Sequence, residues 1–352
     1  MADRLRCAVI GTGAFGTNHL VSLSACPRAT TVALAESDPQ RAREASERFR
    51  ISRSYSDYRE LLEQPDIDAV TIATPNHLHA PVAIAALEAR KHVLLEKPMA
   101  TNSKDAIKII ETAKKMKRVV MVAQNFRFNR HTQLAKMAIE RGALGEVYHA
   151  RGFWIRRSGI PRIGSWFTQK QFAGGGATFD IGVHVLDACL HLMNDFDVQT
   201  VSAQTHAKFG PRGLGEFEWG KSAIDPKRTF DVDDFSTALI RTRSGKSIVI
   251  EVAWAAFVAN DAREHGIDLL GTNAGLSLYP ARLFRNGADG YEEVQLHQTK
   301  LPYSEDRIQH FVHSILEGKR TIVPPEESLK IIQVLEAINQ SSTSGKEVRL
   351  GK

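Results

Sequence analysis

The fold of the first part of this chain is decided by the stretch Leu5–Gly16, which reads LRCAVIGTGAFG. Its first six residues are a short apolar run, typical of a buried parallel strand. A G-x-G-x-x-G pattern follows at once, and a helical apolar spacing comes after it. In this context the first glycine permits a tight turn, the second lets a pyrophosphate approach the backbone, and the third lets helix pack on strand. The expected contacts of a dinucleotide here are Gly11, Gly13, Ala14, Phe15 and Gly16.

A second apolar strand, 31–35, ends at Glu36. This carboxylate follows Gly16 by about 20 residues, the spacing at which an acidic side chain binds both ribose hydroxyls of an adenosine. A carboxylate there repels a 2′-phosphate, so the sequence favours NAD over NADP. Ser37 and Arg41 keep NADP open as the less favoured cofactor, because a hydroxyl and a guanidinium can accommodate that phosphate.

Strands and helices alternate through the first 124 residues. Helices are expected over 38–49, 57–62, 80–89 and 103–117, and further strands over 69–73, 92–95 and 119–123. The pattern predicts a doubly wound parallel sheet, which binds ligands at the C-terminal ends of its strands. The further cofactor contacts expected at those ends are Thr74, Pro75, Asn76, His79, Glu96, Lys97 and Gln124.

Three glycines open the stretch GGGATFDIGVHVLD, which begins at Gly174. They suit either close approach by a ligand or a sharp turn. The apolar spacing that follows predicts a helix, on which Asp180 and His184 share one face four residues apart. A carboxylate beside an imidazole is the usual apparatus for moving a proton at neutral pH. The alternative is an aspartate that favours the helix dipole and a histidine bonded to a backbone carbonyl.

Arginines and a tryptophan lie in the segments before that helix. The loop 156–167 is basic and punctuated by glycine, so it either covers a site or is a solvated loop. Forked arginine donors bind vicinal hydroxyls and carboxylates. Arg127 either contacts a ligand or forms an ion pair between domains, and Trp166 either stacks on a ring or anchors a lid. The candidate substrate contacts are Arg127, Arg156, Arg162 and Trp166, and Trp166 is also a candidate cofactor contact.

The second half of the chain predicts an α/β domain with a large open, mostly antiparallel sheet. Strands are expected over 146–155, 198–206, 236–241, 247–253, 266–270 and 276–279, and helices over 131–141, 304–317 and 326–341. The long connection 208–234 is rich in glycine and charge, and a loop of that length is usually functional or mobile. The expected domains are 1–124 and 125–352, with the last helix able to pack back on the first.

Composition excludes several classes of protein. The 46 basic residues are interleaved with 40 acidic ones in 352 residues, and neither a dense basic run nor a stacking-aromatic pattern occurs, so no nucleic-acid partner is expected. No apolar run has the length of a membrane span, and the N-terminus lacks the apolar core of a signal peptide. The scattered Cys7, Cys26 and Cys189 indicate a reducing, cytoplasmic setting. His77 and His79 lack a ligand set with recognisable metal spacing, so no metal is expected.

Taken in order, the glycine loop, Glu36, Glu96-Lys97-Pro98 and the triple-glycine stretch resemble the Gfo/Idh/MocA oxidoreductases, which include inositol dehydrogenases and glucose–fructose oxidoreductase. The resemblance extends to 311–318 and 324–327. It implies a Rossmann domain, a second domain with a large open sheet, and a homodimer or homotetramer formed through that sheet. It also implies that the catalytic residues are Lys97, Asp180 and His184.

The resemblance implies an NAD-dependent oxidation of a secondary hydroxyl of a sugar, sugar derivative or cyclitol. His184 would accept the hydroxyl proton, Lys97 would stabilise the alkoxide, and Asp180 would orient the reacting groups. One alternative in the family cleaves a glycosidic bond through transient oxidation, elimination and re-reduction. A second is a non-catalytic dinucleotide-sensing regulator, in which the Lys97 and His184 pair would be expected to be lost.

Overall fold

The structure is a computed structural model that describes residues 4–217, 222–259, 263–297 and 300–351. It divides into two compact units, one of Met1–Gln124 with Glu305–Ile332 and one of Asn125–Ser304 with Gln333–Lys352. Part of the predicted connection 208–234, residues 218–221, lies outside the described residues. Among the described residues, no helix has the length and apolar character needed to cross a bilayer.

The first unit is built on a six-stranded parallel sheet of order β3-β2-β1-β4-β5-β6. The strands are β1 (Leu5–Ile10), β2 (Ala29–Ala35), β3 (Ser54–Tyr55), β4 (Ala69–Ile72), β5 (His92–Leu95) and β6 (Val120–Val122). Every residue of β4 and β6 is buried, as expected of strands with helices on both faces. Successive strands are added on one side of β1 up to β3 and on its other side from β4 onward, and this reversal in strand order confirms the predicted doubly wound topology.

Five helices connect these strands: α1 (Ala14–Ser24), α2 (Pro39–Phe49), α3 (Tyr58–Leu62), α4 (Asn76–Glu88) and α5 (Ser103–Met116). The predicted start of α4 at Ala80 was wrong. Pro81 is typical of a first helical turn, but here it lies inside the helix. Its missing N–H removes one hydrogen bond, and the helix still begins directly after Pro75.

The sixth helix of the first unit, α9 (Arg307–Glu317), comes from the far end of the chain. Ion pairs hold this region to the first unit: Arg307 with Glu96 at 3.1 Å and Lys114 with Glu326 at 3.0 Å. The sequence predicted residues 305–332 to lie in the second domain. In the structure these residues pack with the first unit. The helix α10 (Pro325–Ser344) continues into the second unit from Gln333.

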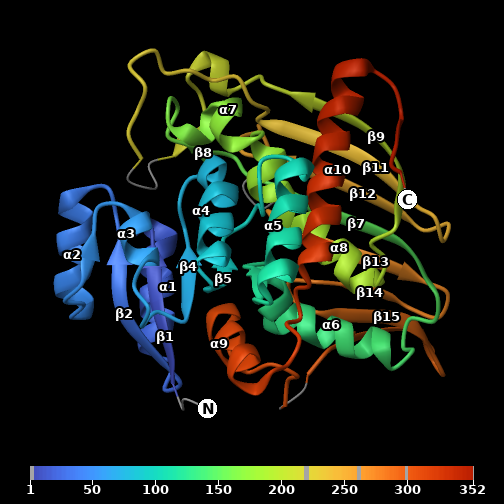
Figure 1. Cartoon of the computed structure of the whole chain (residues 1–352). Helices are drawn as coiled ribbons and strands as arrows, with labels where there is room; N and C mark the ends of the chain where they lie inside the picture. Colours follow the sequence, from blue (N-terminus) through green and yellow to red (C-terminus); the bar gives the residue numbers. More distant parts are fainter. Residues whose placement is uncertain (1–3, 218–221, 260–262, 298–299, 352) are drawn as a thin grey trace. The chain divides into compact units, whose positions relative to one another are not determined.

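The second unit is built on a nine-stranded sheet of order β16-β15-β14-β13-β7-β12-β11-β9-β17, most of which is visible as a row of arrows in Figure 1. The strands are β7 (Val147–Ile155), β9 (Val198–His206), β11 (Phe235–Thr242), β12 (Ser247–Ala253), β13 (His265–Gly271), β14 (Gly275–Ser277), β15 (Arg282–Gly287), β16 (Gly290–Gln295) and β17 (Val348–Arg349). β7 pairs parallel with β12, and the other pairs are antiparallel. The predicted mostly antiparallel sheet is confirmed, although the sequence missed β15, β16 and β17.

The helix α8 (Val183–Met193) lies against β7 because Gly152 has no side chain. A Cβ on Gly152 would lie 2.4 Å from Val185 and 2.8 Å from the Cys189 sulfur. The short 3₁₀ helix η1 (Asn125–Phe128) and α6 (Arg130–Glu140) pack beside α8. The close contact at Gly152 sets the distance between α8 and the sheet.

Short elements occur inside the two predicted loops of the second unit. The first contains β8 (Ile160–Pro161) and the 3₁₀ helix η2 (Trp166–Thr168), followed by α7 (Lys170–Ala173). The second contains η4 (Gly210–Arg212) and β10 (Glu216–Phe217), and β10 pairs parallel with β8. The pairing joins two segments that are more than fifty residues apart in the chain.

Candidate active site

The glycine loop after β1 contains two glycines that the fold requires and one that it does not. Gly11 has φ +85°, and a Cβ there would lie 2.8 Å from the Ala73 carbonyl oxygen. A Cβ on Gly16 would lie 1.8 Å from the Gly11 carbonyl oxygen. A Cβ on Gly13 would meet nothing within 4 Å. Open space at this one position, at the N-terminus of α1, fits a bound pyrophosphate.

Glu36 ends β2 with a carboxylate that is already held by protein donors. Oε2 accepts from the Thr12 N–H at 2.8 Å and Oε1 from the Arg41 guanidinium at 2.9 Å, and the Asp38 N–H adds a bond at 3.0 Å. Burial raises the pKa of Glu36, but these hydrogen bonds outweigh it and leave the pKa below its usual value. Ser37 lies at the edge of this group, 3.4 Å from Oε1. Arg41 therefore offsets the negative charge at the position that discriminates between NAD and NADP.

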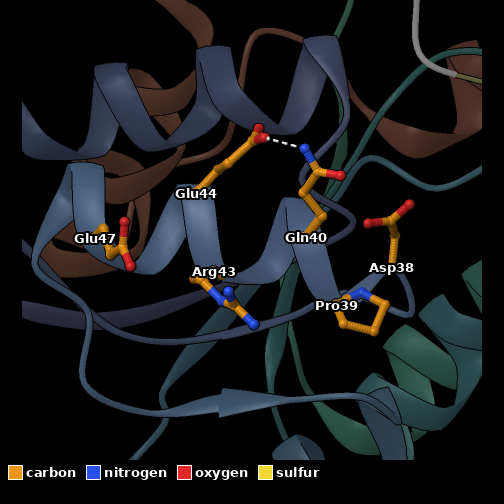
Figure 2. Close-up of a pocket in the computed structure, with 6 residues that line it drawn as sticks. All are labelled: Asp38, Pro39, Gln40, Arg43, Glu44 and Glu47. Carbon is orange, nitrogen blue, oxygen red and sulfur yellow. Dashed lines mark hydrogen bonds between the residues drawn. The ribbon is translucent and has the colours of Figure 1, made fainter.

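A second arginine, Arg43, lies on another side of α2 from Arg41, and it offers a control for the role of Arg41 in cofactor selection. Arg43 lines an open groove on the exposed side of α2, together with Asp38, Pro39, Gln40, Glu44 and Glu47 (Figure 2). Gln40 donates to Glu44, one turn further along α2, at 2.9 Å. Five of the six lining residues belong to α2 itself and the sixth, Asp38, is its N-cap, so the groove is a surface of this helix.

His79 fixes the loops after β4 and β5 with respect to each other. Its buried ring has Nδ1 2.7 Å from the Pro98 carbonyl and Nε2 2.9 Å from the Thr74 carbonyl. Burial lowers its pKa. Both ring nitrogens thus face the backbone, which indicates that His79 orders the predicted cofactor contacts Thr74, Pro75 and Asn76. Gln124, at the end of β6, is also buried.

Glu96 anchors the end of β5 to two helices of the first unit. Oε1 lies 2.9 Å from Nε2 of His19 and 3.1 Å from Nη2 of Arg307, and Oε2 accepts the Lys97 N–H at 3.2 Å. Burial raises the pKa of Glu96, but His19, Arg307 and Lys97 lower it more, far below its usual value. The Lys97 side chain is 9% exposed, and its Nζ lies 5.9 Å from the centre of the Phe15 ring. The structure thus brings Lys97 beside the glycine loop.

A buried aspartate explains the triple glycine of the second unit. The Asp233 carboxylate accepts from the Gly176 N–H at 2.7 Å, and from the N–H and hydroxyl of Thr178 at 2.8 and 2.7 Å. A Cβ on Gly176 would lie 1.8 Å from the Asp233 carbonyl oxygen, and one on Gly175 2.5 Å from the Phe179 ring. Gly174 has φ +85° and ends α7. These glycines are required by packing within the chain, so the structure supports the sharp turn rather than close approach by a ligand.

Asp180 and His184 follow that turn in a geometry that the sequence did not predict. Residues Thr178–Gly182 form a turn of π-helix, η3, and α8 begins only at Val183. Single π turns are rare and frequently occur at functional sites. Asp180 and His184 are each 7% exposed. The spacing of four residues therefore spans a π turn and the start of an α-helix.

Aromatic side chains surround this pair. Phe126 stacks on the His184 ring at a centroid distance of 5.2 Å, and Trp154 lies at 6.0 Å. The indole N–H of Trp254 donates to Asp180 Oδ2 at 2.9 Å. Sequence reasoning placed Phe126 in a loop expected to line the site but missed Trp154 and Trp254, because an aromatic residue at a strand end carries no signal that distinguishes a site from a core.

The candidate arginines and Trp166 have partners within the second unit. Arg127 donates from Nε to Asp187 of α8 at 3.0 Å, and both side chains are 1% exposed. Of the two predicted alternatives for Arg127, the structure gives an ion pair, formed inside one unit. The guanidinium of Arg156 lies 4.6 Å from the centre of the Trp154 ring and 3.5 Å from Glu264. Arg162 donates to the Ser222 carbonyl at 3.4 Å, and Trp166 stacks on Phe167.

No group of three or more histidine, cysteine, aspartate or glutamate side chains suited to a metal ion occurs in the described part of the chain. Cys7, Cys26 and Cys189 are buried, reduced thiols. The second unit supplies a buried carboxylate and an imidazole, and the first unit supplies an ammonium beside a glycine loop.

Two family models match most of the chain. Residues 5–124 match the oxidoreductase family with an NAD-binding Rossmann fold, and residues 132–277 match the GFO/IDH/MocA C-terminal domain. The first match runs from the start of β1 to just after β6. The second runs from within α6 to the last residue of β14.

Named relatives and solved structures agree with the family models. Levoglucosan dehydrogenase of Pseudarthrobacter phenanthrenivorans is 37% identical over 69% of this chain and 66% of its own length. D-glucoside 3-dehydrogenase of Escherichia coli is 29% identical over 98% of this chain and 97% of its own length. A structure of levoglucosan dehydrogenase with NADH and levoglucosan matches with a TM-score of 0.84 and 27% identity, over 99% of this chain and 100% of that one.

Replacing Gly13 with alanine should weaken NADH binding by about 10-fold or more, because the new methyl group enters the space left for the pyrophosphate. The free energy of unfolding should change by less than about 1 kcal/mol. Gly16→Ala is the matched control, since its methyl group meets the Gly11 carbonyl and should destabilise the protein by about 2 kcal/mol or more. Titration of NADH fluorescence and denaturant unfolding measure both effects. Normal NADH affinity in folded Gly13→Ala would contradict the assignment.

Replacing Arg41 with alanine should raise the ratio of the Kd for NADPH to the Kd for NADH by about 10-fold, the order expected for one charge-assisted hydrogen bond. The change removes a cation and leaves Glu36 to repel the 2′-phosphate. Arg43→Ala, on the groove side of the same helix (Figure 2), should leave the ratio within about 2-fold of the original. Equal ratios in both variants would exclude Arg41 from cofactor selection.

Proposed function

Since this chain belongs to the Gfo/Idh/MocA oxidoreductases and is an NAD-dependent dehydrogenase, we propose that it oxidises a secondary hydroxyl of a sugar, sugar derivative or cyclitol, or reduces the matching keto compound. The named relatives support this substrate class, because their names refer to levoglucosan, D-glucosides and myo-inositol. These relatives are named dehydrogenases, so the regulator alternative is not carried forward.

The observation that carries the proposal is the buried pair formed by Asp180 on the π turn and His184 in the first turn of α8. Removing hydride from a secondary alcohol also requires removal of the hydroxyl proton. His184 supplies an imidazole for that proton, and its ring is held by stacking on Phe126. Asp180, held by Trp254, orients the substrate hydroxyl or the imidazole.

Lys97 takes the third role in the proposed reaction. An ammonium stabilises the negative charge that develops on the substrate oxygen as its proton leaves. Its backbone is fixed by Glu96 and its side chain is close to the glycine loop. NAD, when bound, supplies the hydride acceptor.

His184→Ala and Lys97→Ala should each lower kcat by about 100-fold or more, because each removes a proton acceptor or a charge that acts in the transition state. NADH binding should persist in both. His206→Ala and Lys115→Ala replace exposed residues of the same types and serve as controls. Initial rates are measured on a panel of sugars, glycosides and inositols. Near-normal turnover in both site variants would exclude the assigned roles.

The glycoside-cleaving alternative is separated from net oxidation by the same assay. A dehydrogenase accumulates one NADH for each substrate oxidised, whereas cleavage through transient oxidation returns the hydride and releases sugar without net NADH. Following NADH absorbance and product release together distinguishes the two reactions.

The exposed face of the large sheet supports a homodimer or homotetramer. Gly152 faces α8, so its strand neighbours Arg151 and Phe153 lie on the opposite face. Val249 pairs with Arg151 across that face, and Leu270, 44% exposed, lies in register with His149. Leu270→Asp should shift the protein towards monomers in sedimentation velocity, because it replaces an exposed apolar side chain of this face by a charge that an interface would have to bury. An unchanged oligomer in Leu270→Asp, or a monomeric original protein, would contradict assembly through this face.

A further inference from the structure

Trp254 follows the last residue of β12 and is fully buried. Its indole N–H donates to Asp180 Oδ2 at 2.9 Å. We propose that Trp254 is a positioning residue, which sets the orientation of the Asp180 carboxylate and acts on the reaction only through it. The inference rests on the proposed function, in which Asp180 orients the reacting groups.

The backbone of Trp254 is fixed independently of Asp180. Its N–H donates to the Asp234 carbonyl at 2.9 Å, and this bond holds it against the start of β11. An indole has a single donor and no acceptor, so in this position it has one polar function, the bond to Asp180. With no exposed surface, the ring cannot contact a substrate in solution.

The need for such a donor follows from the torsional freedom of a carboxylate. The last side-chain torsion of aspartate is broad and roughly two-fold, so backbone position alone does not fix which way the two oxygens point. A hydrogen bond from a rigid, buried ring selects one orientation. Since a small misplacement of a reacting group can cost a large factor in rate, this bond bears directly on turnover.

The backbone before Asp180 is held from the same end of these two strands, where β11 begins and β12 ends. Asp233, at the start of β11, binds the turn at Gly176 and Thr178 and also accepts the Ala177 N–H at 2.9 Å. Burial raises the pKa of Asp233, and the bonds from Thr178 and Gly176 offset part of this rise. The beginning of β11 therefore fixes the path of the backbone before Asp180. Trp254, at the end of β12, fixes the orientation of the Asp180 side chain. The two roles are separate, and Trp254 carries the second.

If Trp254 only packed in the core, losing its N–H would leave turnover unchanged. The variant Trp254→Phe therefore distinguishes a positioning role from a packing role. Phenylalanine keeps a buried aromatic ring and removes the N–H donor together with the rest of the five-membered ring, so the stability of the variant is measured beside its activity. We expect kcat to fall by about 10-fold with KM within about 2-fold, because the lost contact is one that matters in the transition state. Circular dichroism and thermal unfolding establish that the variant is folded.

A double-mutant cycle then asks whether the effect passes through Asp180. In an Asp180→Ala background, Trp254→Phe should lower kcat by less than about 2-fold. Independent, multiplying effects of the two changes would overturn the proposal and leave the proposed function intact. Near-normal turnover in Asp180→Ala alone would overturn both the role of Asp180 and the inference built on it.

An indole NMR spectrum tests the contact without any substrate. The chain has four tryptophans, and loss of one signal in Trp254→Phe assigns its indole N–H in ¹⁵N-tryptophan-labelled protein. Asp180→Asn should shift that signal, because a charged acceptor becomes neutral. Asp268→Asn, on β13, should leave it in place. An unmoved Trp254 signal in folded Asp180→Asn would overturn the proposal, whatever the activity.

Discussion

The carboxylate of Asp233 holds the turn on which the proposed chemistry depends. It accepts from the backbone N–H groups of Gly176 and Thr178 and from the Thr178 hydroxyl, and the backbone carbonyl of Asp233 accepts the Ala177 N–H between them. A side chain on Gly176 would overlap that backbone carbonyl, so position 176 requires glycine, and the carboxylate of Asp233 supplies the acceptors for the turn. The π turn that follows places Asp180 and His184 with both side chains almost fully buried, where electrostatic interactions are stronger than in water.

Buried ionic groups hold the elements around the candidate site in each unit. In the first, Glu96 joins β5 to α1 and α9 and fixes the backbone beside Lys97. In the second, Arg127 and Asp187 join η1 to α8, which keeps Phe126 stacked on His184. Removing one partner of such a pair leaves a buried charge without compensation, at a cost of about 3–5 kcal/mol. These residues therefore act on the chemistry by holding the groups that perform it.

Several residues predicted as ligand contacts bind other parts of the chain. Arg127, Glu96 and His79 each have their polar atoms close to protein partners. Residue type alone cannot separate these uses, because an arginine fork fits a substrate carboxylate and an aspartate side chain equally well. Gly13 shows the opposite case, since the fold leaves open the space that a side chain would occupy.

The sequence by itself determined the family, the parallel and mostly antiparallel sheets, and NAD as the cofactor. It could do so because the glycine loop, the alternating apolar runs and Glu36 are local patterns with fixed spacing. Only the tertiary structure decided that Asp233 shapes the triple glycine, that Trp254 orients Asp180, and that residues 305–332 join the first unit. The contacts of Asp233 with Thr178, Trp254 with Asp180 and Arg307 with Glu96 link segments 55, 74 and 211 residues apart, and no local pattern specifies which distant residue fills a buried position.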